Sequence, residues 1–256
     1  MIHPTAEIDS DARLADGVQV GAWSIIGTGV EIGEDTWVGP HVVIQGPTRI
    51  GKNNRIYQFN SIGDVPQDKK FAGEVSSLQI GDGNVIREFC TFNRGTHGGG
   101  GVTRIGDDNW IMAYVHVAHD CQVGNHTTLA NGATLAGHVS VGDHVTFGAF
   151  TMVHQFCAIG EYSFSAMSTV ILKDVPPFVT VSGNSARPHG LNKEGLTRHG
   201  FGADTLRELR RAYKTVYKQG LTVNEAVAAL AGAAAQFPQV AAFRDFVASS
   251  TRGVVR

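Results

Sequence analysis

Residues 117–147 read VAHDCQVGNHTTLANGATLAGHVSVGDHVTF, and this stretch decides the fold. A large apolar side chain stands at every sixth position, and the members of this column are Val117, Val123, Leu129, Leu135, Val141 and Phe147. A period of six matches neither the turn of a helix, about 3.6 residues, nor the simple alternation of a half-buried strand. It is typical of a hexapeptide β-helix, in which each hexad supplies one short strand and one turn.

The same period covers most of the chain up to residue 171. The sixth-position column is aliphatic from 2 to 62, resumes at 80, 86 and 92, and continues one position out of register from 105 to 171, broken at Ser165. Small residues lie four positions after most of these side chains, and this second column includes Cys90, Cys121 and Cys157. Two inward columns predict a narrow interior, with coils of about 18 residues stacked as parallel strands roughly 4.8 Å apart. We expect the cysteines to fill this interior, and Gly, Asn and Asp to form the positive-φ corners.

Two segments interrupt the hexads. Residues 64–79 are polar and charged, and residues 94–104 are rich in glycine. Loops that leave a rigid scaffold often carry function, so both are candidate functional loops. The glycine run is equally compatible with a flexible bridge that binds nothing.

The hexads end after Pro176 and Pro177, and the remaining sequence has helical signals. Thr205 with Glu208 and Thr222 with Glu225 have the spacing of capping boxes, and Pro238 suits the first turn of a helix; all lie within residues 203–256. We therefore predict an all-β parallel β-helix over residues 1–190 and a C-terminal α-helical domain over residues 191–256.

The composition indicates a globular protein without a strong charge bias. The 256 residues are 42% hydrophobic and 17% charged, with a net charge of -2. This balance does not favour nucleic acid as a partner. The N-terminal stretch lacks a signal-peptide pattern, and no apolar run is long enough to span a bilayer. Three widely spaced cysteines fit a reducing compartment, so we expect a cytoplasmic protein.

Several stretches together resemble one enzyme family. They are RIYQFNSIG (55–63), AHDCQVGN (118–125), LAGHVSVGD (135–143), VHQFC (153–157), DVPPFV (174–179) and NKEGLTRHGF (192–201). In order and spacing they are similar to the UDP-N-acetylglucosamine O-acyltransferases of lipid A biosynthesis, which are left-handed hexapeptide-repeat acyltransferases. The resemblance implies a left-handed β-helix, a homotrimer, and transfer of a 3-hydroxyacyl chain from acyl carrier protein to the sugar 3-hydroxyl, or to a 3-amine in a variant sugar.

The pair at positions 119 and 120 carries the chemistry that such a transfer needs. Removing a hydroxyl proton near neutral pH suits a histidine base, and a neighbouring carboxylate orients the imidazole. By the resemblance, His119 is the general base, Asp120 is its partner, and the backbone N–H of Gly137 stabilises the oxyanion. The transfer is direct, so neither a nucleophilic Ser or Cys nor a cofactor or metal is expected.

The resemblance also implies substrate-binding positions, which are Asp68, Lys70, His116, His138, His154, Gln155, Asn192, Glu194 and Arg198. Arg198 would serve a diphosphate as a bidentate donor. For His116 and His138, an ordinary solvated turn position is the alternative. His126 and His144 are interpreted as turn residues without a role. Where the family has an HRGT stretch, this chain has Asn93 in place of the histidine.

Two further expectations concern the acyl donor. Residues 197–220 hold six Lys or Arg against Asp204 and Glu208, a surface suited to an acidic carrier protein, although a solvated helix would look the same. Met167 aligns with a position that is glycine in family members that take long chains. A bulky side chain there would block the end of the acyl groove and act as a chain-length ruler, which predicts a 3-hydroxydecanoyl donor.

Three alternatives use the same fold class. A γ-type carbonic anhydrase would bind zinc through histidines at a subunit interface, but the spacing of His116 and His119 does not match that pattern. The related N-acyltransferase of the pathway normally carries an additional N-terminal domain, whereas hexads begin here at Ile2. A non-catalytic β-helix scaffold predicts no turnover with any donor.

Overall fold

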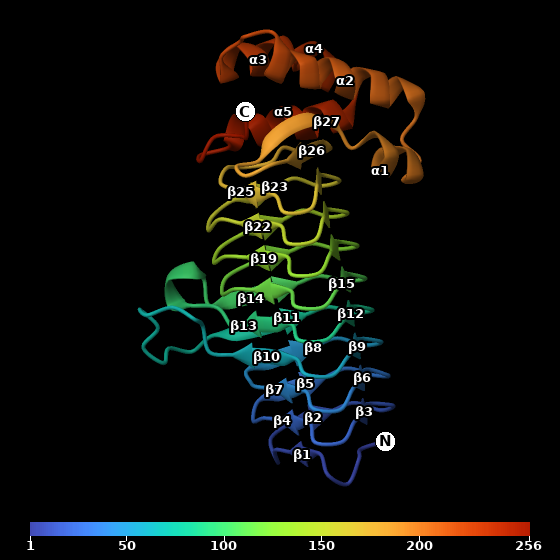
Figure 1. Ribbon diagram of the computed structural model, residues 1–256, viewed down its shortest axis with the longest axis vertical. Helices are drawn as coiled ribbons and strands as arrows, with labels where there is room; N and C mark the ends of the chain where they lie inside the picture. Colours follow the sequence, from blue (N-terminus) through green and yellow to red (C-terminus); the bar gives the residue numbers. More distant parts are fainter.

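A computed structural model describes residues 1–256 and shows a stack of triangular coils with helices at one end (Figure 1). Each complete coil contributes one strand to each of three faces. Face 1 contains β1 (Glu7–Ile8), β4 (Ile25–Ile26), β7 (Val43–Ile44), β10 (Ser61–Asp64), β13 (Thr91–Asn93), β16 (His116–Val117), β19 (Thr134–Leu135), β22 (Met152–Val153) and β25 (Val170–Ile171).

The other two faces are built in the same way. Face 2 contains β2 (Arg13–Leu14), β5 (Val30–Ile32), β8 (Thr48–Ile50), β11 (Ser77–Ile80), β14 (Val102–Ile105), β17 (Gln122–Val123), β20 (Ser140–Val141) and β23 (Ala158–Ile159). Face 3 contains β3 (Gln19–Val20), β6 (Trp37–Val38), β9 (Arg55–Ile56), β12 (Val85–Ile86), β15 (Trp110–Ile111), β18 (Thr128–Leu129), β21 (Thr146–Phe147), β24 (Phe164–Ser165), β26 (Val179–Ser182) and β27 (Arg187–Leu191). Neighbouring strands pair in parallel, except the antiparallel pair β26–β27.

The six-residue column forms the interior, as predicted. Val117 pairs with Leu135, Leu135 pairs with Val153, and all three side chains are buried. At the break in the column, the buried Ser165 hydroxyl hydrogen-bonds to the Thr151 hydroxyl at 2.7 Å, so its polar atom is satisfied. The cysteines are unpaired and buried, which confirms that they fill the core; they are Cys90, Cys121 and Cys157.

The corners are named by the faces that they join: corner 1–2, corner 2–3 and corner 3–1. The prediction that Gly, Asn and Asp provide the positive-φ residues there is wrong in part, because histidines and aromatic residues do so too. At corner 3–1, the rings of Phe59 and Phe89 stack at 5.0 Å, and those of Phe89 and Tyr114 also stack at 5.0 Å. Stacking on the next coil offsets the strain of a positive φ.

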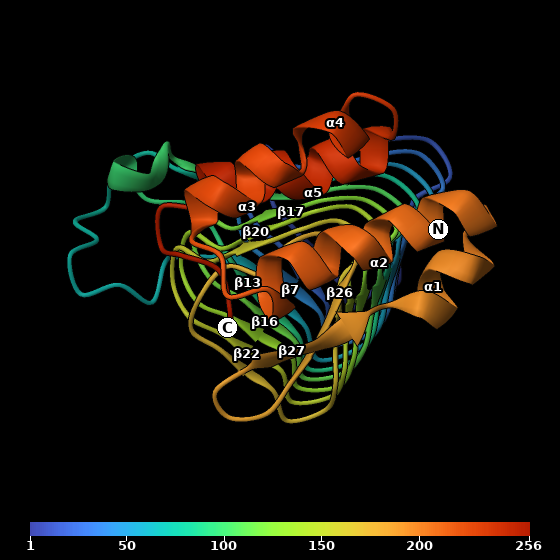
Figure 2. The ribbon, with the colours of Figure 1, turned by 90° about the horizontal axis from the view of Figure 1, so that it is seen from above.

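The helices are α1 (Lys193–Arg198), α2 (Ala203–Lys218), α3 (Val223–Ala229), α4 (Ala231–Ala234) and α5 (Pro238–Ser249). They lie across the end of the stack (Figure 2), and α5 is next to the last coils (Figure 1). The capping box of Thr222 and Glu225 and the N-terminal Pro238 are as predicted. The predicted box at Thr205 is wrong, because α2 begins at Ala203 and places this residue inside its first turn. No helix combines the length and apolar character that crossing a membrane requires.

Candidate active site

Three consecutive coils bring the central residues of the predicted site to corner 1–2. His119 and Asp120 lie in the turn between β16 and β17, and Gly137 and His138 lie in the next turn, between β19 and β20. His154 and Gln155 follow one coil further, between β22 and β23. Because the strands pair in register, residues about 18 apart lie above one another. Asp120 and His138 both have positive φ, at 62° and 63°.

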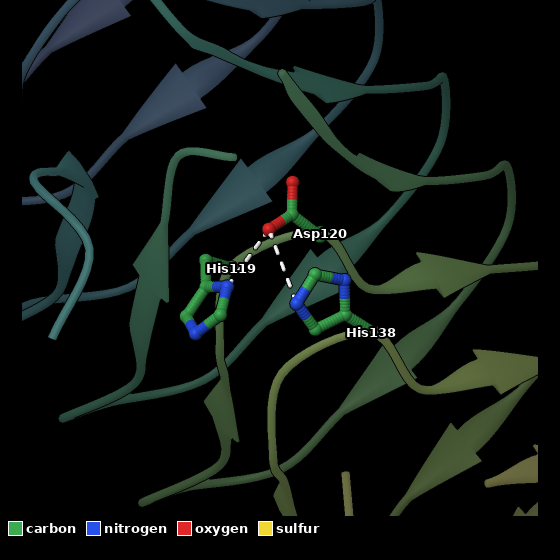
Figure 3. Close-up of side chains that lie close together, drawn as sticks. All are labelled: His119, Asp120 and His138. Atoms are coloured by element: carbon green, nitrogen blue, oxygen red, sulfur yellow. Dashed lines mark hydrogen bonds and ion pairs between the residues drawn. The ribbon is translucent and has the colours of Figure 1, made fainter. Parts of the chain in front are cut away.

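His119 and Asp120 form a hydrogen-bonded pair (Figure 3). The Nδ1 atom of His119 lies 2.8 Å from Oδ2 of Asp120, whose side chain is 0% exposed, whereas that of His119 is 15% exposed. An ionised carboxylate only accepts hydrogen bonds, so Nδ1 carries the proton in this contact. The other ring nitrogen, Nε2, is then unprotonated in the neutral imidazole and can accept a proton.

His138 stands beside this pair. Its Nε2 atom lies 3.8 Å from Oδ2 of Asp120, and its ring meets that of His119 edge-on at 5.1 Å (Figure 3). Phe156 from the next coil stacks on His138 at 4.3 Å. Burial lowers the pKa of His138, and the carboxylates of Asp120 and Asp68 act in the opposite direction.

Gly137 is buried against the base. A Cβ atom at this position would lie 2.6 Å from Cε1 of His119, closer than side chains tolerate. The Gly137 N–H makes no hydrogen bond within the protein, although the N–H of the next residue, His138, is bonded to the carbonyl of His119. An unused backbone donor beside the base suits an oxyanion.

The remaining histidines of this corner have different surroundings. His116 projects from β16, and its Nδ1 atom lies 2.7 Å from the Thr91 hydroxyl. Burial lowers the pKa of His116, and the nearby His119 lowers it further. His154 is exposed and lies 3.2 Å from a guanidinium nitrogen of Arg252, a residue that the sequence analysis did not single out.

Residues in and next to the two interrupting segments complete the corner, and among them the sequence analysis did not single out Thr96. Thr96 donates its backbone N–H and its hydroxyl to Asp120, at 2.8 and 2.6 Å. Asn93, at the family's histidine position, donates to the carbonyl of Val65 at 2.7 Å and so anchors the start of the first loop. In that loop Asp68 is half-buried and Lys70 is exposed.

Four predicted residues lie away from this corner. Asn192, Glu194 and Arg198 lie in or next to α1 at corner 2–3, where the Asn192 amide donates to the carbonyl of Tyr162 at 3.0 Å. Met167 lies at corner 3–1, between β24 and β25, with 69% of its surface exposed. The structure of one chain therefore does not gather the whole predicted site.

The two histidines that were assigned no role belong to a stack at corner 2–3. His126 stacks on His144 at 4.9 Å, and His144 stacks on Tyr162 at 4.5 Å. His199, just after α1, meets both His144 and Tyr162 edge-on, at 4.7 and 5.1 Å. The stack holds the α1 segment against the coils. The spacing of 18 residues revealed the alignment of His126 and His144 but not this contact.

One group of side chains has the proximity that a metal site would need. His119, Asp120 and His138 each offer a ligand atom, and these atoms lie within 4.8 Å of one another. The Oδ2 atom of Asp120 already accepts from the Thr96 hydroxyl and from His119. Asp120 thus links Thr96 to the imidazole of His119 in a hydrogen-bonded chain, and His138 lies beside this chain without a hydrogen bond to it.

Comparison with known proteins places this geometry in a family. The profile "Udp N-acetylglucosamine O-acyltransferase; Domain 2" matches residues 174–255, and "Bacterial transferase hexapeptide (six repeats)" matches residues 29–60 and 103–137. A Thiobacillus denitrificans protein named acyl-(acyl-carrier-protein)–UDP-N-acetylglucosamine O-acyltransferase is 56% identical over 255 residues, which cover 100% of this chain and 99% of the relative. The chain belongs to the UDP-N-acetylglucosamine O-acyltransferase family.

Solved structures agree with this assignment. The Moraxella catarrhalis UDP-N-acetylglucosamine O-acyltransferase has a TM-score of 0.97 at 46% identity, covering 100% of this chain and 99% of the other. The Francisella novicida UDP-N-acetylglucosamine acyltransferase has a TM-score of 0.98 at 40% identity, covering 100% and 94%. The predicted fold class, a left-handed β-helix with a C-terminal helical region, is confirmed. The protein is an acyltransferase, and the carbonic anhydrase alternative is not favoured.

Proposed function

We propose that this chain transfers an (R)-3-hydroxyacyl group from acyl carrier protein to the 3-hydroxyl of UDP-N-acetylglucosamine, as the first step of lipid A biosynthesis. The observation that carries the proposal is the pair of His119 and Asp120 beside the unused N–H of Gly137. The names of the full-length relatives supply the substrates. Three free, buried thiols are typical of a reducing compartment, so we assign the reaction to the cytoplasm.

The chemistry follows from the arrangement of these three residues. Nε2 of His119 accepts the proton of the sugar 3-hydroxyl while its oxygen attacks the thioester carbonyl carbon. The N–H of Gly137 donates to the oxyanion that forms. When the carbon–sulfur bond breaks, the imidazolium returns its proton to the departing thiolate, and Asp120 stabilises the positive charge in between. No protein nucleophile is needed.

The acceptor site requires residues from two corners. Of the residues that we assign to the acceptor, His116 lies on β16 just before the base, His138 lies one coil later at corner 1–2, and His154 and Gln155 lie together in the following turn of that corner. Asp68 and Lys70 belong to the first loop. Asn192, Glu194 and Arg198, which we assign to the nucleotide, lie at corner 2–3. Within one triangular prism these corners are separated by the width of face 2. We therefore propose a homotrimer in which corner 1–2 of one copy meets corner 2–3 of the next.

The distribution of exposed apolar side chains supports this arrangement. The outward residues of face 2 are polar or charged along most of its length, as at Arg49, Arg104 and Gln122. Most exposed apolar residues of the coils occur instead on faces 1 and 3 and at corner 3–1, and Phe156 at corner 1–2 is an exception; those on faces 1 and 3 and at corner 3–1 include Trp23, Ile25, Phe59, Phe89, Trp110, Tyr114, Phe150 and Met152. In the proposed trimer, face 1 packs against face 3 of a second copy, and corner 3–1 lies at the three-fold axis.

The basic helix α2 is the proposed docking surface for acyl carrier protein. Asp204 and Glu208 pair with Arg207 and Arg211. The cations without a salt-bridge partner line a neighbouring pocket of about 310 Å³, and are Arg210, Lys214 and Lys218 of α2 and Lys193 of α1. The proposed docking surface is therefore smaller than the whole of residues 197–220. It consists of the cations that have no salt-bridge partner within the chain, because these are available to an acidic protein.

Acyl chain length is assigned to Met167. Its exposed side chain lies at corner 3–1, where the proposed trimer would cover it. An acyl chain that runs from corner 1–2 along the seam between copies would end against this side chain. We infer a preference for a 3-hydroxydecanoyl donor.

The test is an acyl-transfer assay read by mass spectrometry, with UDP-N-acetylglucosamine and 3-hydroxyacyl carrier proteins of different chain lengths. We expect product with the wild type and its loss with His119→Ala. His3→Ala, at an exposed histidine in the first coil whose side chain hydrogen-bonds only to Thr5, is the matched control and should remain active. Activity that survives in His119→Ala would refute the proposed base, and no product with any donor would favour the scaffold alternative.

A further inference from the structure

The glycine-rich segment 94–101 lies directly against the candidate active site. It leaves the coils after β13 and returns at β14, so it replaces the turn at corner 1–2 that is one coil before His119. The N–H of Gly95 donates to the carbonyl of Ser77, and the N–H of Ser77 donates to the carbonyl of Gly101. These bonds tie both ends of the segment to the strand that follows the first loop.

Within the segment, Thr96 is the residue that contacts the catalytic pair. It is buried, and it gives Asp120 two of the three hydrogen bonds that this carboxylate receives from side chains and backbone. The N–H groups of Gly99 and Gly101 donate to the Thr96 carbonyl and hold the residue in place. A Cβ atom on Gly99 would overlap the Asp120 carboxylate, so this close approach requires glycine.

We propose that Thr96 is a positioning residue for acyl transfer, which acts by holding the Asp120 carboxylate toward His119. This inference rests on the proposed function. With Oδ1 taken by the N–H of Thr96 and Oδ2 by its hydroxyl, the carboxylate cannot rotate away without losing both bonds. Oδ2 therefore stays in line with Nδ1 of His119, which keeps the proton on Nδ1 and leaves Nε2 free for the substrate hydroxyl.

The first test compares two substitutions of similar size. Thr96→Val removes the hydroxyl and retains the backbone N–H, whereas Thr96→Ser retains both. We expect Thr96→Val to lower kcat by about 10- to 100-fold, which corresponds to one lost hydrogen bond to a charged group. The KM for the nucleotide sugar should change little, and Thr96→Ser should restore most of the kcat. Equal kcat values for Thr96→Val and wild type would overturn the proposal.

A double-mutant cycle distinguishes positioning from a merely structural role. If Thr96 acts only through Asp120, then Thr96→Val should cause no further loss of kcat in an Asp120→Asn background. Losses that multiply would mean that Thr96 acts on catalysis by another route and would overturn the assignment.

Two neighbouring glycines provide a test that does not depend on Thr96 variants being folded. Gly98→Ala adds a methyl group into open space, whereas Gly99→Ala pushes one into the Asp120 carboxylate. Neither residue has a positive φ, so the change in backbone freedom is matched. We expect Gly99→Ala to lower kcat at least 10-fold and Gly98→Ala to leave it unchanged. Equal effects of the two substitutions would contradict the proposal.

The outcomes separate this inference from the proposed function. A wild type without acyl transfer would refute the proposed function itself, and a fully active His119→Ala variant would refute its proposed base. An active wild type that depends on His119 but not on Thr96 or Gly99 would refute only the positioning role.

Discussion

The separation of the predicted site between two corners leads to a quantitative prediction about mixed assemblies. His119→Ala removes the proposed base at corner 1–2, and Arg198→Ala removes a proposed nucleotide-binding group at corner 2–3. Each variant alone should be nearly inactive when the nucleotide sugar is kept well below its KM. If each site combines two copies, one variant can supply the corner that the other lacks.

The expected recovery follows from the symmetry of a trimer. In a random 1:1 assembly, a site is intact when the copy that supplies corner 1–2 carries Arg198→Ala and its neighbour carries His119→Ala. The probability is about one half times one half, so about one quarter of all sites should be active. A site built within one chain would give no recovery, because every chain carries one of the two substitutions.

The assay uses co-expression with two affinity tags, purification of the mixed trimers through both tags in turn, and acyl transfer measured by mass spectrometry. Selecting trimers that contain both variants raises the active fraction to about one third, since each such trimer has one intact site in three. A chain that carries both substitutions, co-assembled at random with wild type, is the control. It should retain about one quarter of the sites if they are shared and about one half if they are not. Activity that stays at the level of the separate variants would refute the shared site.

The other predictions concern the acyl chain, pH and the thiols. Met167→Gly should shift the preferred donor toward 14 carbons, with a gain of about 0.8 kcal/mol per additional buried CH₂; unchanged preference in a competition assay with mixed donors would contradict the ruler. The pKa values of His116 and His138 are lowered in the folded chain, so the unfolded chain binds more protons near their ordinary pKa. Their contribution to the free energy of unfolding is therefore complete above about pH 6.5 and decreases as the pH is lowered further. Denaturant titrations at pH 7.5 and 5 should show this loss, and a His116→Gln variant should show less of it. Burial raises the pKa of Cys90 and Cys121 to about 12, so iodoacetamide should alkylate them at pH 8 only after unfolding, as mass spectrometry of native and denatured protein will show.

Much of the coil structure could be predicted because it is periodic. Each hexad repeats the same local structure, one buried apolar side chain followed by a turn. Val117 and Val153 could therefore be assigned to the interior from their spacing alone. The same spacing of about 18 residues put His138 one coil above Asp120. The corners were less predictable, because a stacked ring such as Phe89 stabilises a positive φ that would otherwise favour Gly, Asn or Asp.

The site was predictable only in its local part. His119 and Asp120 are adjacent in the chain, so the sequence indicated them directly. Thr96 lies 24 residues before Asp120, in a segment that has no period and could equally have been a bridge. No pattern indicates which way such a segment folds once it leaves the coils.

The sequence by itself therefore determined the β-helix and its interior columns, because these depend on contacts that recur at a constant spacing along the chain. It also indicated the adjacent residues His119 and Asp120 as the candidate catalytic pair. Only the tertiary structure decided that Thr96 holds Asp120, and that Arg198 and His119 stand at different corners. Those relations depend on the path of a non-repeating loop and on which turn of the coil each residue occupies, and both are set by packing in space.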